Sequence, residues 1–278
     1  RFCIDYRILN EVTVKAHYPM PDAKAILGRL GQCKYFIQMD LRDGFYQLML
    51  HEGSRRYTAF STPLGLMEWC RVPMGACNAP GHFQRTMDEI FKDMRDTVDI
   101  FIDDLLIGAG TIEELMDKFN KVLARLAKCR VRVKLEKCKF GAREIIALGH
   151  QVDGVGMKIS DTRKAEIQAS PRPRTKTEVL SFLGMCGFVS DWLGSDYATV
   201  KAPLTDLTRK DTPWVWDPDQ ETAFRELKRR VQEATTMHHM DYDHPIIVRT
   251  DASEIGIGAV LINVVGGVER TCGYISRK

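Results

Sequence analysis

Two adjacent carboxylates, Asp103 and Asp104, lie inside a strongly apolar run at residues 98–107. The run predicts two short strands with the acidic pair at the bend between them. Side-by-side carboxylates repel each other, and an apolar hairpin has no need of them. Hard cations such as Mg²⁺ prefer carboxylate oxygens, usually one or two of them together with substrate phosphates. Taken alone, the pair fits a solvated turn better than a metal site, because aspartate is common in turns.

A third carboxylate, Asp40, ends another apolar run at residues 35–41, which predicts a strand. An α+β sheet could bring the ends of these strands together. Three convergent carboxylates suit two metal ions, of which one activates an attacking hydroxyl and the other steadies a leaving pyrophosphate. In phosphoryl transfer the protein contributes mainly positioning and neutralisation of charge.

The elements that must position these carboxylates come from residues 1–155, which mix short apolar strands with helices in an α+β pattern. A helix is expected at residues 111–127. Thr111 can cap it, and apolar side chains repeat at helical spacing at Leu115, Phe119, Leu123 and Leu126. Other expected elements are a helix at residues 82–91 and strands at 134–140 and 145–152.

After Gly154-Val155-Gly156 the pattern becomes mainly helical, with joints rich in proline. Helices are expected at residues 161–169, 177–192 and 219–233. Strands return near the C-terminus, at residues 245–251 and 256–262, and a third begins near Cys272.

The composition is that of an ordinary soluble globular protein, with 44% hydrophobic and 28% charged residues in 278. We find neither a signal peptide nor an apolar stretch that could span a bilayer, and no membrane partner is expected. The sequence begins with Arg1 inside an apparent strand and ends without a cap signal, so we expect a piece of a longer polypeptide.

Two further compositional features concern cysteine and positive charge. The eight cysteines are scattered without a C-x-x-C pair, which argues against zinc and favours reduced, mostly buried thiols in an intracellular protein. The net charge is only +3, yet basic residues crowd residues 125–139 and 163–176. Each basic cluster could follow a phosphate backbone, and each could equally be a solvated face.

Nine short motifs together resemble the reverse transcriptases of Gypsy-type long-terminal-repeat retrotransposons, over essentially the whole chain. The motifs are RFCIDYRILN at residues 1–10, YPMP at 18–21, MDLRDGFYQ at 39–47, TAF at 58–60, PMGACNAP at 73–80, FQRTMD at 83–88, LGH at 148–150, SFLG at 181–184 and TDAS at 250–253. Each motif alone is modest, but nine in family order are highly specific.

The resemblance assigns roles to individual residues. It implies that Asp40 and Asp103 are the principal metal ligands and that Asp104 completes the acidic triad. Phe45 stands where the family places the bulky residue that excludes a ribose 2′-hydroxyl, because an aromatic ring against C2′ admits only a deoxynucleotide. Arg1 matches a fingers arginine that contacts the incoming triphosphate.

Further roles follow from the same resemblance. Met74 and Gly75 would lie under the incoming nucleotide and the template base. Three residues would belong to the hairpin that grips the primer end, namely Leu148, Gly149 and His150. Asp251 matches the first metal-binding aspartate of a ribonuclease H domain whose other acidic ligands lie further along the family's sequence. No ribonuclease H activity is therefore expected from this fragment alone, although the parent polyprotein would have it.

The implied fold class is α+β, a right-hand polymerase followed by the truncated start of a ribonuclease H-like α/β domain. The expected domains are fingers and palm at residues 1–155, truncated at the N-terminus, a helical thumb and connection at 156–243, and the first strands of the incomplete ribonuclease H-like domain at 244–278.

The implied activity is that of an RNA-directed and DNA-directed DNA polymerase. The implied cofactor is a pair of Mg²⁺ ions, with Mn²⁺ as an alternative. The partners would be an RNA template, a DNA primer or RNA–DNA hybrid, and deoxynucleoside triphosphates. A dimer is left open, and the expected location is cytoplasmic, in a virus-like particle, or nuclear. One alternative from another class remains, a degenerate or domesticated copy that binds nucleic acid without catalysis.

Overall fold

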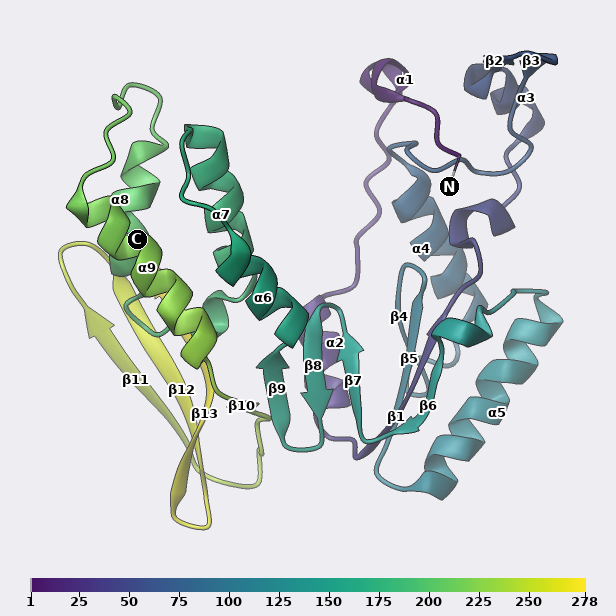
Figure 1. Ribbon diagram of the computed structural model, residues 1–278. Coiled ribbons are helices and arrows are strands. Elements are labelled where there is room, and N and C mark those ends of the chain that lie inside the picture. Colours follow the sequence, from purple (N-terminus) through teal and green to yellow (C-terminus); the bar gives the residue numbers. More distant parts are fainter. Residues whose placement is uncertain (1) are drawn as a thin grey trace. The chain divides into compact units, whose positions relative to one another are not determined.

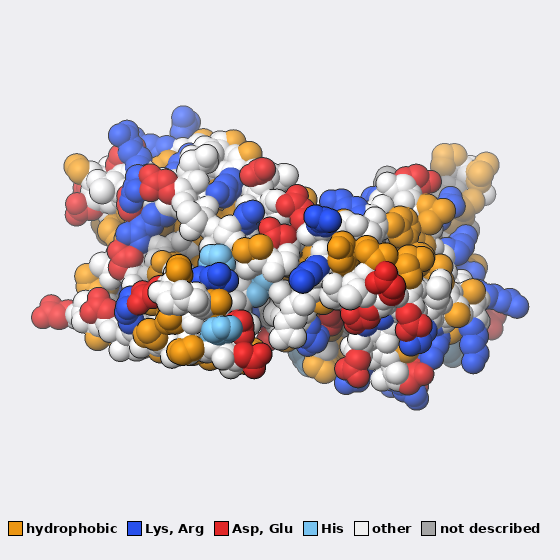
Figure 2. All heavy atoms as spheres, turned by 90° about the horizontal axis from the view of Figure 1, so that it is seen from below, with side chains coloured by type: hydrophobic (Ala, Val, Ile, Leu, Met, Phe, Trp, Pro, Cys, Tyr) orange, Lys and Arg blue, Asp and Glu red, His pale blue; other side chains and the backbone are white. Residues whose placement is uncertain are grey.

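The computed structural model describes residues 2–278, and the chain divides into two compact units, Arg1–Ile145 and Ile146–Lys278. Within the described residues no helix has both the length and the apolar character needed to cross a membrane. On the face drawn in Figure 2, basic, acidic and apolar side chains are interspersed. That face therefore presents no extended field of one charge sign.

The first unit is built on an antiparallel four-stranded sheet in the order β4-β5-β1-β6 (Figure 1). Its strands are β1 (Tyr35–Asp40), β4 (Asp99–Phe101), β5 (Asp104–Ala109) and β6 (Lys139–Ala142). A separate hairpin is formed by β2 (Phe60–Thr62) and β3 (Gly65–Met67). The helices are α1 (Arg7–Val12), α2 (Ala23–Leu30), α3 (Glu52–Arg55), α4 (Ala79–Ile90) and α5 (Ile112–Lys128), with 3₁₀ turns η1 (Gly44–Gln47), η2 (Arg56–Thr58) and η3 (Leu135–Lys137).

Alternation along β1 gives the two faces of this sheet different characters. Ile37 and Met39 are buried in the apolar cluster that also contains side chains of α4 and α5. The intervening side chains Phe36, Gln38 and Asp40 point to the opposite face. That face therefore changes from apolar to acidic toward the end of the strand, and the acidic end does not interrupt the core.

The predicted helix after Thr111 is confirmed as α5. The Thr111 hydroxyl accepts a hydrogen bond from the Glu114 backbone N–H, which satisfies one of the free donors at the helix start. Leu115 and Leu126 are buried, as the spacing predicted. The prediction was wrong about Leu123, which is exposed, because the buried stripe passes through Val122 instead.

The second unit combines helices with two sheets, ordered β10-β9-β8-β7 and β11-β12-β13. The strands are β7 (Glu144–Ala147), β8 (His150–Asp153), β9 (Gly156–Ile159), β10 (Met237–His238), β11 (Ile246–Ala252), β12 (Ile257–Val265) and β13 (Val268–Arg277). The helices are α6 (Asp161–Ala169), α7 (Lys176–Phe188), α8 (Tyr197–Leu207) and α9 (Pro218–Glu233), with a 3₁₀ turn η4 (Ser190–Trp192). The three predicted C-terminal strands are confirmed.

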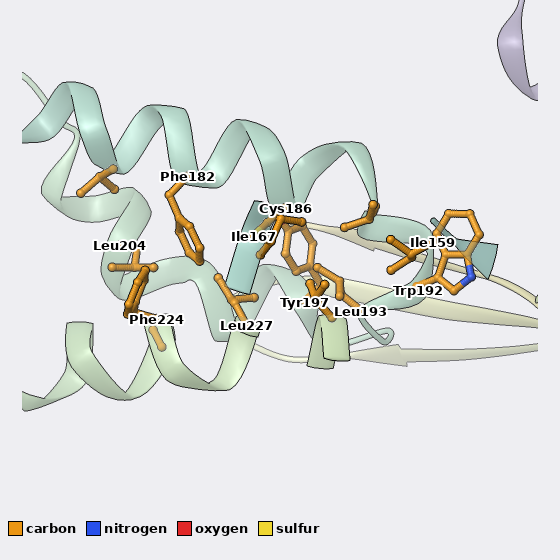
Figure 3. Packing of buried hydrophobic residues seen from close by; sticks show 14 of the residues in the cluster. Ile159, Ile167, Phe182, Cys186, Trp192, Leu193, Tyr197, Leu204, Phe224 and Leu227 are labelled. Carbon is orange, nitrogen blue, oxygen red and sulfur yellow. The ribbon is translucent and has the colours of Figure 1, made fainter. Parts of the chain in front are cut away.

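Figure 3 shows the core of the second unit, in which side chains of α7, α8 and α9 meet. Phe182, Leu204 and Phe224 interdigitate there, and the ring centroids of Phe182 and Phe224 are 4.7 Å apart. Trp192 and Ile159 extend the same cluster toward the strands. This packing explains why segments far apart in the sequence form one compact unit.

Four element predictions were wrong. Residues 145–152 do not form one strand, because Leu148 and Gly149 have φ of 50° and 80° and make a turn. The segment 134–140 contains η3, where the Lys137 N–H bonds to the Lys134 carbonyl, and only its last two residues belong to a strand, β6. The helix at 177–192 ends at Phe188. Helix α8 was missed, and Pro203 lies inside it, where proline normally disfavours a helix.

The expectation of mostly buried cysteines was also wrong. Cys186 is buried, whereas Cys3, Cys70 and Cys129 are exposed, and the remaining four are intermediate. All eight are free thiols in the described residues, as predicted.

Candidate active site

Two of the three predicted carboxylates stand directly opposite each other. In the antiparallel pairing of β1 with β5, Asp40 is the register partner of Asp104. Directly opposed residues in such a pair have Cβ atoms about 4.5–5.5 Å apart, on one face of the sheet. Both side chains are half-buried. The sheet therefore brings together two acids that lie far apart in the sequence.

Asp103 lies in the two-residue turn that joins β4 to β5. Its carbonyl accepts a hydrogen bond from the Leu41 N–H at 3.1 Å, which ties the turn to the end of β1. The other turn residue, Ile102, has φ of 55°, in the left-handed region that β-branched residues avoid. Such a conformation costs about 1–3 kcal/mol and persists only where the surroundings hold it.

The charges at this edge are unfavourable unless a cation balances them. Burial raises the pKa of Asp104, and the neighbouring charges of Asp103 and Asp40 raise it further. The ammonium of Lys137, on η3, lies 3.1 Å from a carboxylate oxygen of Asp40. Lys137 thus supplies one positive charge to an edge that carries three carboxylates.

Gln84, on α4, holds the turn by hydrogen bonds to its backbone, and no role for this residue was predicted from the sequence. This side chain is fully buried. Its Oε1 accepts a hydrogen bond from the Ile102 N–H at 2.6 Å, and its Nε2 donates to the Ile100 carbonyl at 3.3 Å. Its place in the motif FQRTMD was a signal that Gln84 matters. Its hydrogen-bond partners lie 16 and 18 residues away, however, and the sequence could not predict them.

The structure places the Phe45 segment beside the acidic turn. A Cβ atom added at Gly44 would lie 3.5 Å from both the Asp103 Cβ and the ring of Phe83. The half-buried ring of Phe45 packs edge-on against Phe83, with centroids 5.6 Å apart. The backbone at Gly44 therefore approaches the turn closely, and Phe45 follows it directly.

The loop with Met74 and Gly75 is held by the side chain of Asn10. Asn10 donates from Nδ2 to the Gly75 carbonyl at 2.8 Å and accepts from the Cys77 N–H at 2.9 Å. Gly75 has φ of 93°, which favours glycine, and Met74 is half-buried. Arg1, the predicted triphosphate contact, lies outside the described residues.

The predicted primer hairpin belongs to the second unit. Leu148 and Gly149 form the two-residue turn between β7 and β8. The His150 ring is only 8% exposed and stacks between Phe188 and Trp192, with centroids 4.8 and 5.1 Å away. A contact with a ligand from this segment would therefore come from the turn rather than from the His150 ring.

Asp251 lies on β11, where its side chain is exposed. Within the described residues no three His, Cys, Asp or Glu side chains converge to hold a metal ion by themselves, either here or at Asp40. The first unit nevertheless fits divalent cations, because Mg²⁺ usually takes one or two carboxylates and completes its shell with water and substrate phosphates. The mutual repulsion that raises the pKa of Asp104 is relieved by such a cation.

Comparison with known proteins places this geometry in a family. Residues 1–152, more than half of the chain, match the family described as "Reverse transcriptase (RNA-dependent DNA polymerase)". The chain belongs to the reverse transcriptase family. Residues 216–278 match the "RNase H-like domain found in reverse transcriptase". Both matches agree with the resemblance read from the nine motifs, which is confirmed.

Curated relatives of this reverse transcriptase chain include retrovirus-related Pol polyproteins of Drosophila melanogaster. It is 34% identical to that of transposon 297 over 94% of the chain, and 32% identical to that of transposon gypsy over 94%. It is also 26% identical to the transposon Tf2-3 polyprotein of Schizosaccharomyces pombe over 94%. The chain spans only 20–26% of the length of these three relatives.

Solved structures share the fold. The foamy viral protease-reverse transcriptase in complex with dsDNA has a TM-score of 0.85 at 24% identity, covering 100% of this chain and 58% of that one. The same kind of protein in complex with an RNA/DNA hybrid has a TM-score of 0.78 at 23% identity, over 98% of this chain and 37% of that one. The predicted α+β polymerase fold is therefore confirmed.

Proposed function

We propose that this chain is the polymerase part of an RNA-directed DNA polymerase that also copies DNA, and that it adds deoxynucleotides to a primer 3′-hydroxyl. The observation that supports this most strongly is the register pairing of Asp40 with Asp104 beside the turn residue Asp103. An ordinary hairpin gains nothing from three carboxylates at one edge, whereas phosphoryl transfer requires concentrated charge and fixed positions.

Asp40, Asp103 and Asp104 would hold two divalent ions. We propose that both are Mg²⁺, with Mn²⁺ as the alternative. When bound, such ions would activate the primer hydroxyl and neutralise the charge of the leaving pyrophosphate. The chain's own contribution is to hold the carboxylates at one sheet edge and to keep that edge open to the triphosphate. Lys137 adds a positive charge beside Asp40.

Phe45 would select deoxynucleotides by placing its ring against C2′ of the incoming sugar. Its contact with the buried ring of Phe83 restricts its movement, which a steric gate requires. Gly75 and Met74 would lie under the incoming nucleotide, and the loop that carries them is fixed by Asn10. Arg1 is assigned to the triphosphate by the same family pattern.

The proposed partners are an RNA template and a DNA primer, together with the hybrid that they form. Foamy viral reverse transcriptases have been solved with dsDNA and with an RNA/DNA hybrid, which supports this choice. The turn Leu148-Gly149 would contact the primer, with His150 anchoring the start of β8 beneath it, and the basic clusters would follow the phosphates. The parent polyprotein would act in a cytoplasmic virus-like particle or in the nucleus.

Primer extension on an RNA template with Mg²⁺ tests the proposal. The parent chain should extend the primer, and the Asp103→Asn variant should be slower by roughly 10²-fold or more, as for loss of one preorganised electrostatic group. Binding of primer–template without any extension by the parent would support a degenerate copy instead. Equal extension by parent and variant would refute the role of Asp103.

A Phe45→Ala variant tests the sugar gate separately. It should incorporate ribonucleotides more readily than the parent, because the ring that excludes the 2′-hydroxyl is gone. Unchanged selectivity between ribonucleotides and deoxynucleotides would reject that assignment.

A further inference from the structure

A chain of three hydrogen-bonded side chains runs from Tyr18 along one side of α4 to the acidic turn. The Tyr18 hydroxyl donates to Oδ2 of Asp88 at 2.5 Å. Oδ1 of Asp88 accepts from Nε2 of Gln84 at 2.8 Å. Gln84 then accepts from the Ile102 N–H at 2.6 Å, so the chain ends on the strained residue that precedes Asp103.

Two acceptors hold the nitrogen end of the Gln84 amide, and Asp88 makes the shorter contact, at 2.8 Å against 3.3 Å for the Ile100 carbonyl. A carboxamide has an acceptor oxygen and a donor nitrogen of nearly equal size, and either could face the turn. An ionised carboxylate only accepts hydrogen bonds, so Asp88 requires the nitrogen end of Gln84. The oxygen end must then face the Ile102 N–H. With the amide reversed, its nitrogen would face the Ile102 N–H, and two buried donors would meet without an acceptor.

Position along α4 makes this arrangement specific. Gln84 and Asp88 are four residues apart and therefore lie on the same side of the helix. Gln84 is fully buried and Asp88 half-buried, with Tyr18 covering the carboxylate. Without Asp88, Nε2 of Gln84 would keep only its longer hydrogen bond, to the Ile100 carbonyl at 3.3 Å.

We propose that Asp88, held by Tyr18, is a positioning residue that sets the acidic turn through the orientation of Gln84. This inference rests on the proposed function only for its consequence in catalysis. Asp88 touches neither the proposed metal ligands nor substrate, and it acts through the hydrogen bond of Gln84 to Ile102.

The most direct test is hydrogen exchange of the Ile102 amide in the full chain. Asp88→Asn keeps the shape of Asp88 but offers a donor as well as an acceptor, so the only acceptor that still requires the nitrogen end of Gln84 is the more distant Ile100 carbonyl. Exchange at Ile102 should become roughly 10-fold faster, while protection in α5 stays unchanged. Tyr18→Phe should act in the same direction by a smaller factor. Unchanged exchange at Ile102 in Asp88→Asn would overturn the proposal.

Glu89→Gln is the matched control, because it removes a neighbouring charge on α4 whose carboxylate pairs with exposed Lys92. It should leave exchange at Ile102 unchanged. A double-mutant cycle separates positioning from simple loss of stability. If Asp88 acts through Gln84, Asp88→Asn should have no further effect on Ile102 exchange in a Gln84→Met background. Equal effects of Asp88→Asn in both backgrounds would contradict the proposed route.

Mn²⁺ affinity and primer extension then measure the consequence for the site. Asp88→Asn should weaken Mn²⁺ binding by roughly 10-fold and lower kcat, with little change in KM for primer–template, as loss of a group that supports metal ligands does. If the parent neither binds Mn²⁺ nor extends a primer, the proposed function fails, and Ile102 exchange still decides the positioning role. Normal Mn²⁺ affinity and kcat in Asp88→Asn would refute that role.

Discussion

Asp104 is the carboxylate whose ionisation the fold opposes most clearly, because burial and two neighbouring charges all raise its pKa. A residue that serves only the fold would not be kept in such a place. Functional sites often carry groups that lower stability, and removing them then gains stability while losing activity. Asp104 should show this opposition between stability and activity.

Asp104→Asn should therefore lose primer extension by roughly 10²-fold or more without losing stability. The asparagine keeps the size of the side chain and removes its charge from between Asp40 and Asp103. Urea denaturation should give a free energy of unfolding equal to or above that of the parent. A clear loss of stability together with normal extension would contradict this account of Asp104.

Lys137 competes with any cation that approaches Asp40, since its ammonium already lies 3.1 Å from that carboxylate. Lys137→Met should raise Mn²⁺ affinity about 2–5-fold, in line with the ~1 kcal/mol or less that a half-exposed ion pair contributes. Lys139→Met is the control, because it removes an exposed positive charge on the next element. Equal effects of the two substitutions would mean that only the overall charge matters.

At the residue scale, the sequence could predict the acidic residues but not the side chains that support them. Asp103 and Asp104 stand out because charges are unusual in an apolar run. Lys137 lies 97 residues from Asp40, and Asp88 lies 70 from Tyr18. No local pattern connects such pairs, so only the folded chain reveals them.

Two hairpin turns illustrate the same limit at the scale of elements. Both contain a non-glycine residue with positive φ, Ile102 in one and Leu148 in the other. Sequence rules place glycine or asparagine at such positions, so the Leu148 turn was missed, whereas the bend next to Ile102 was predicted only from the two acidic residues beside it. Helix caps were easier, because Thr111 forms a local hydrogen bond that depends only on nearby residues.

Gly149→Ala should destabilise the second unit by about 1–3 kcal/mol. Gly149 has φ of 80°, and an added Cβ would lie 3.0 Å from the ring of Phe188. Gly184→Ala is the control, since Gly184 lies inside α7 with open space around it. That substitution should stabilise by about 0.5–1 kcal/mol, as alanine favours a helix. Urea denaturation measures both, and a reversed order of the two variants would contradict the structure of this turn.

A charge network ties α9 to the start of α8, with Arg230 between Asp196 and Glu226. Hydrogen bonds from Arg229 and Arg230 lower the pKa of Glu226 to about 2. A carboxylate whose pKa is lowered by folding stabilises the fold at pH values above its pKa in the unfolded chain, which is about 4.3 for glutamate. That contribution is lost as the pH falls through the pKa of the folded state.

Glu226→Gln should therefore lower the free energy of unfolding at pH 7 by roughly 1 kcal/mol or less, because the pair is partly exposed. The difference between parent and variant should shrink as the pH is lowered from 5 toward 2. Thermal or urea unfolding over that range measures it. A difference that grows toward acidic pH would have the wrong sign for this network.

At the scale of the whole molecule, the sequence shows where its pattern of helices and strands changes, but it does not show where the two compact units divide. The pattern changes at Gly154-Val155-Gly156, whereas the first unit ends at Ile145. The reason is long-range pairing, since Met157 on β9 is the register partner of Met237 on β10. Such a pairing across 80 residues leaves no trace in local periodicity.

The ribonuclease H-like strands should not cleave RNA in an RNA/DNA hybrid. Two-metal hydrolysis needs several convergent carboxylates, and the family pattern assigns that role to Asp251 alone within residues 244–278. We expect no cleavage of hybrid RNA by this chain with Mg²⁺ or Mn²⁺, even where the primer is extended. Cleavage abolished by Asp251→Asn would refute this prediction.

The central claim is that Asp40, Asp103 and Asp104 hold divalent ions at one edge of the sheet. Fe²⁺ in place of Mg²⁺, with ascorbate and peroxide, produces hydroxyl radicals that cut the backbone near the bound ion. We predict cuts at Asp40 and at residues 102–104, suppressed by excess Mg²⁺ and absent in Asp40→Asn. Cuts confined to other segments, or unchanged cuts in Asp40→Asn, would contradict the claim.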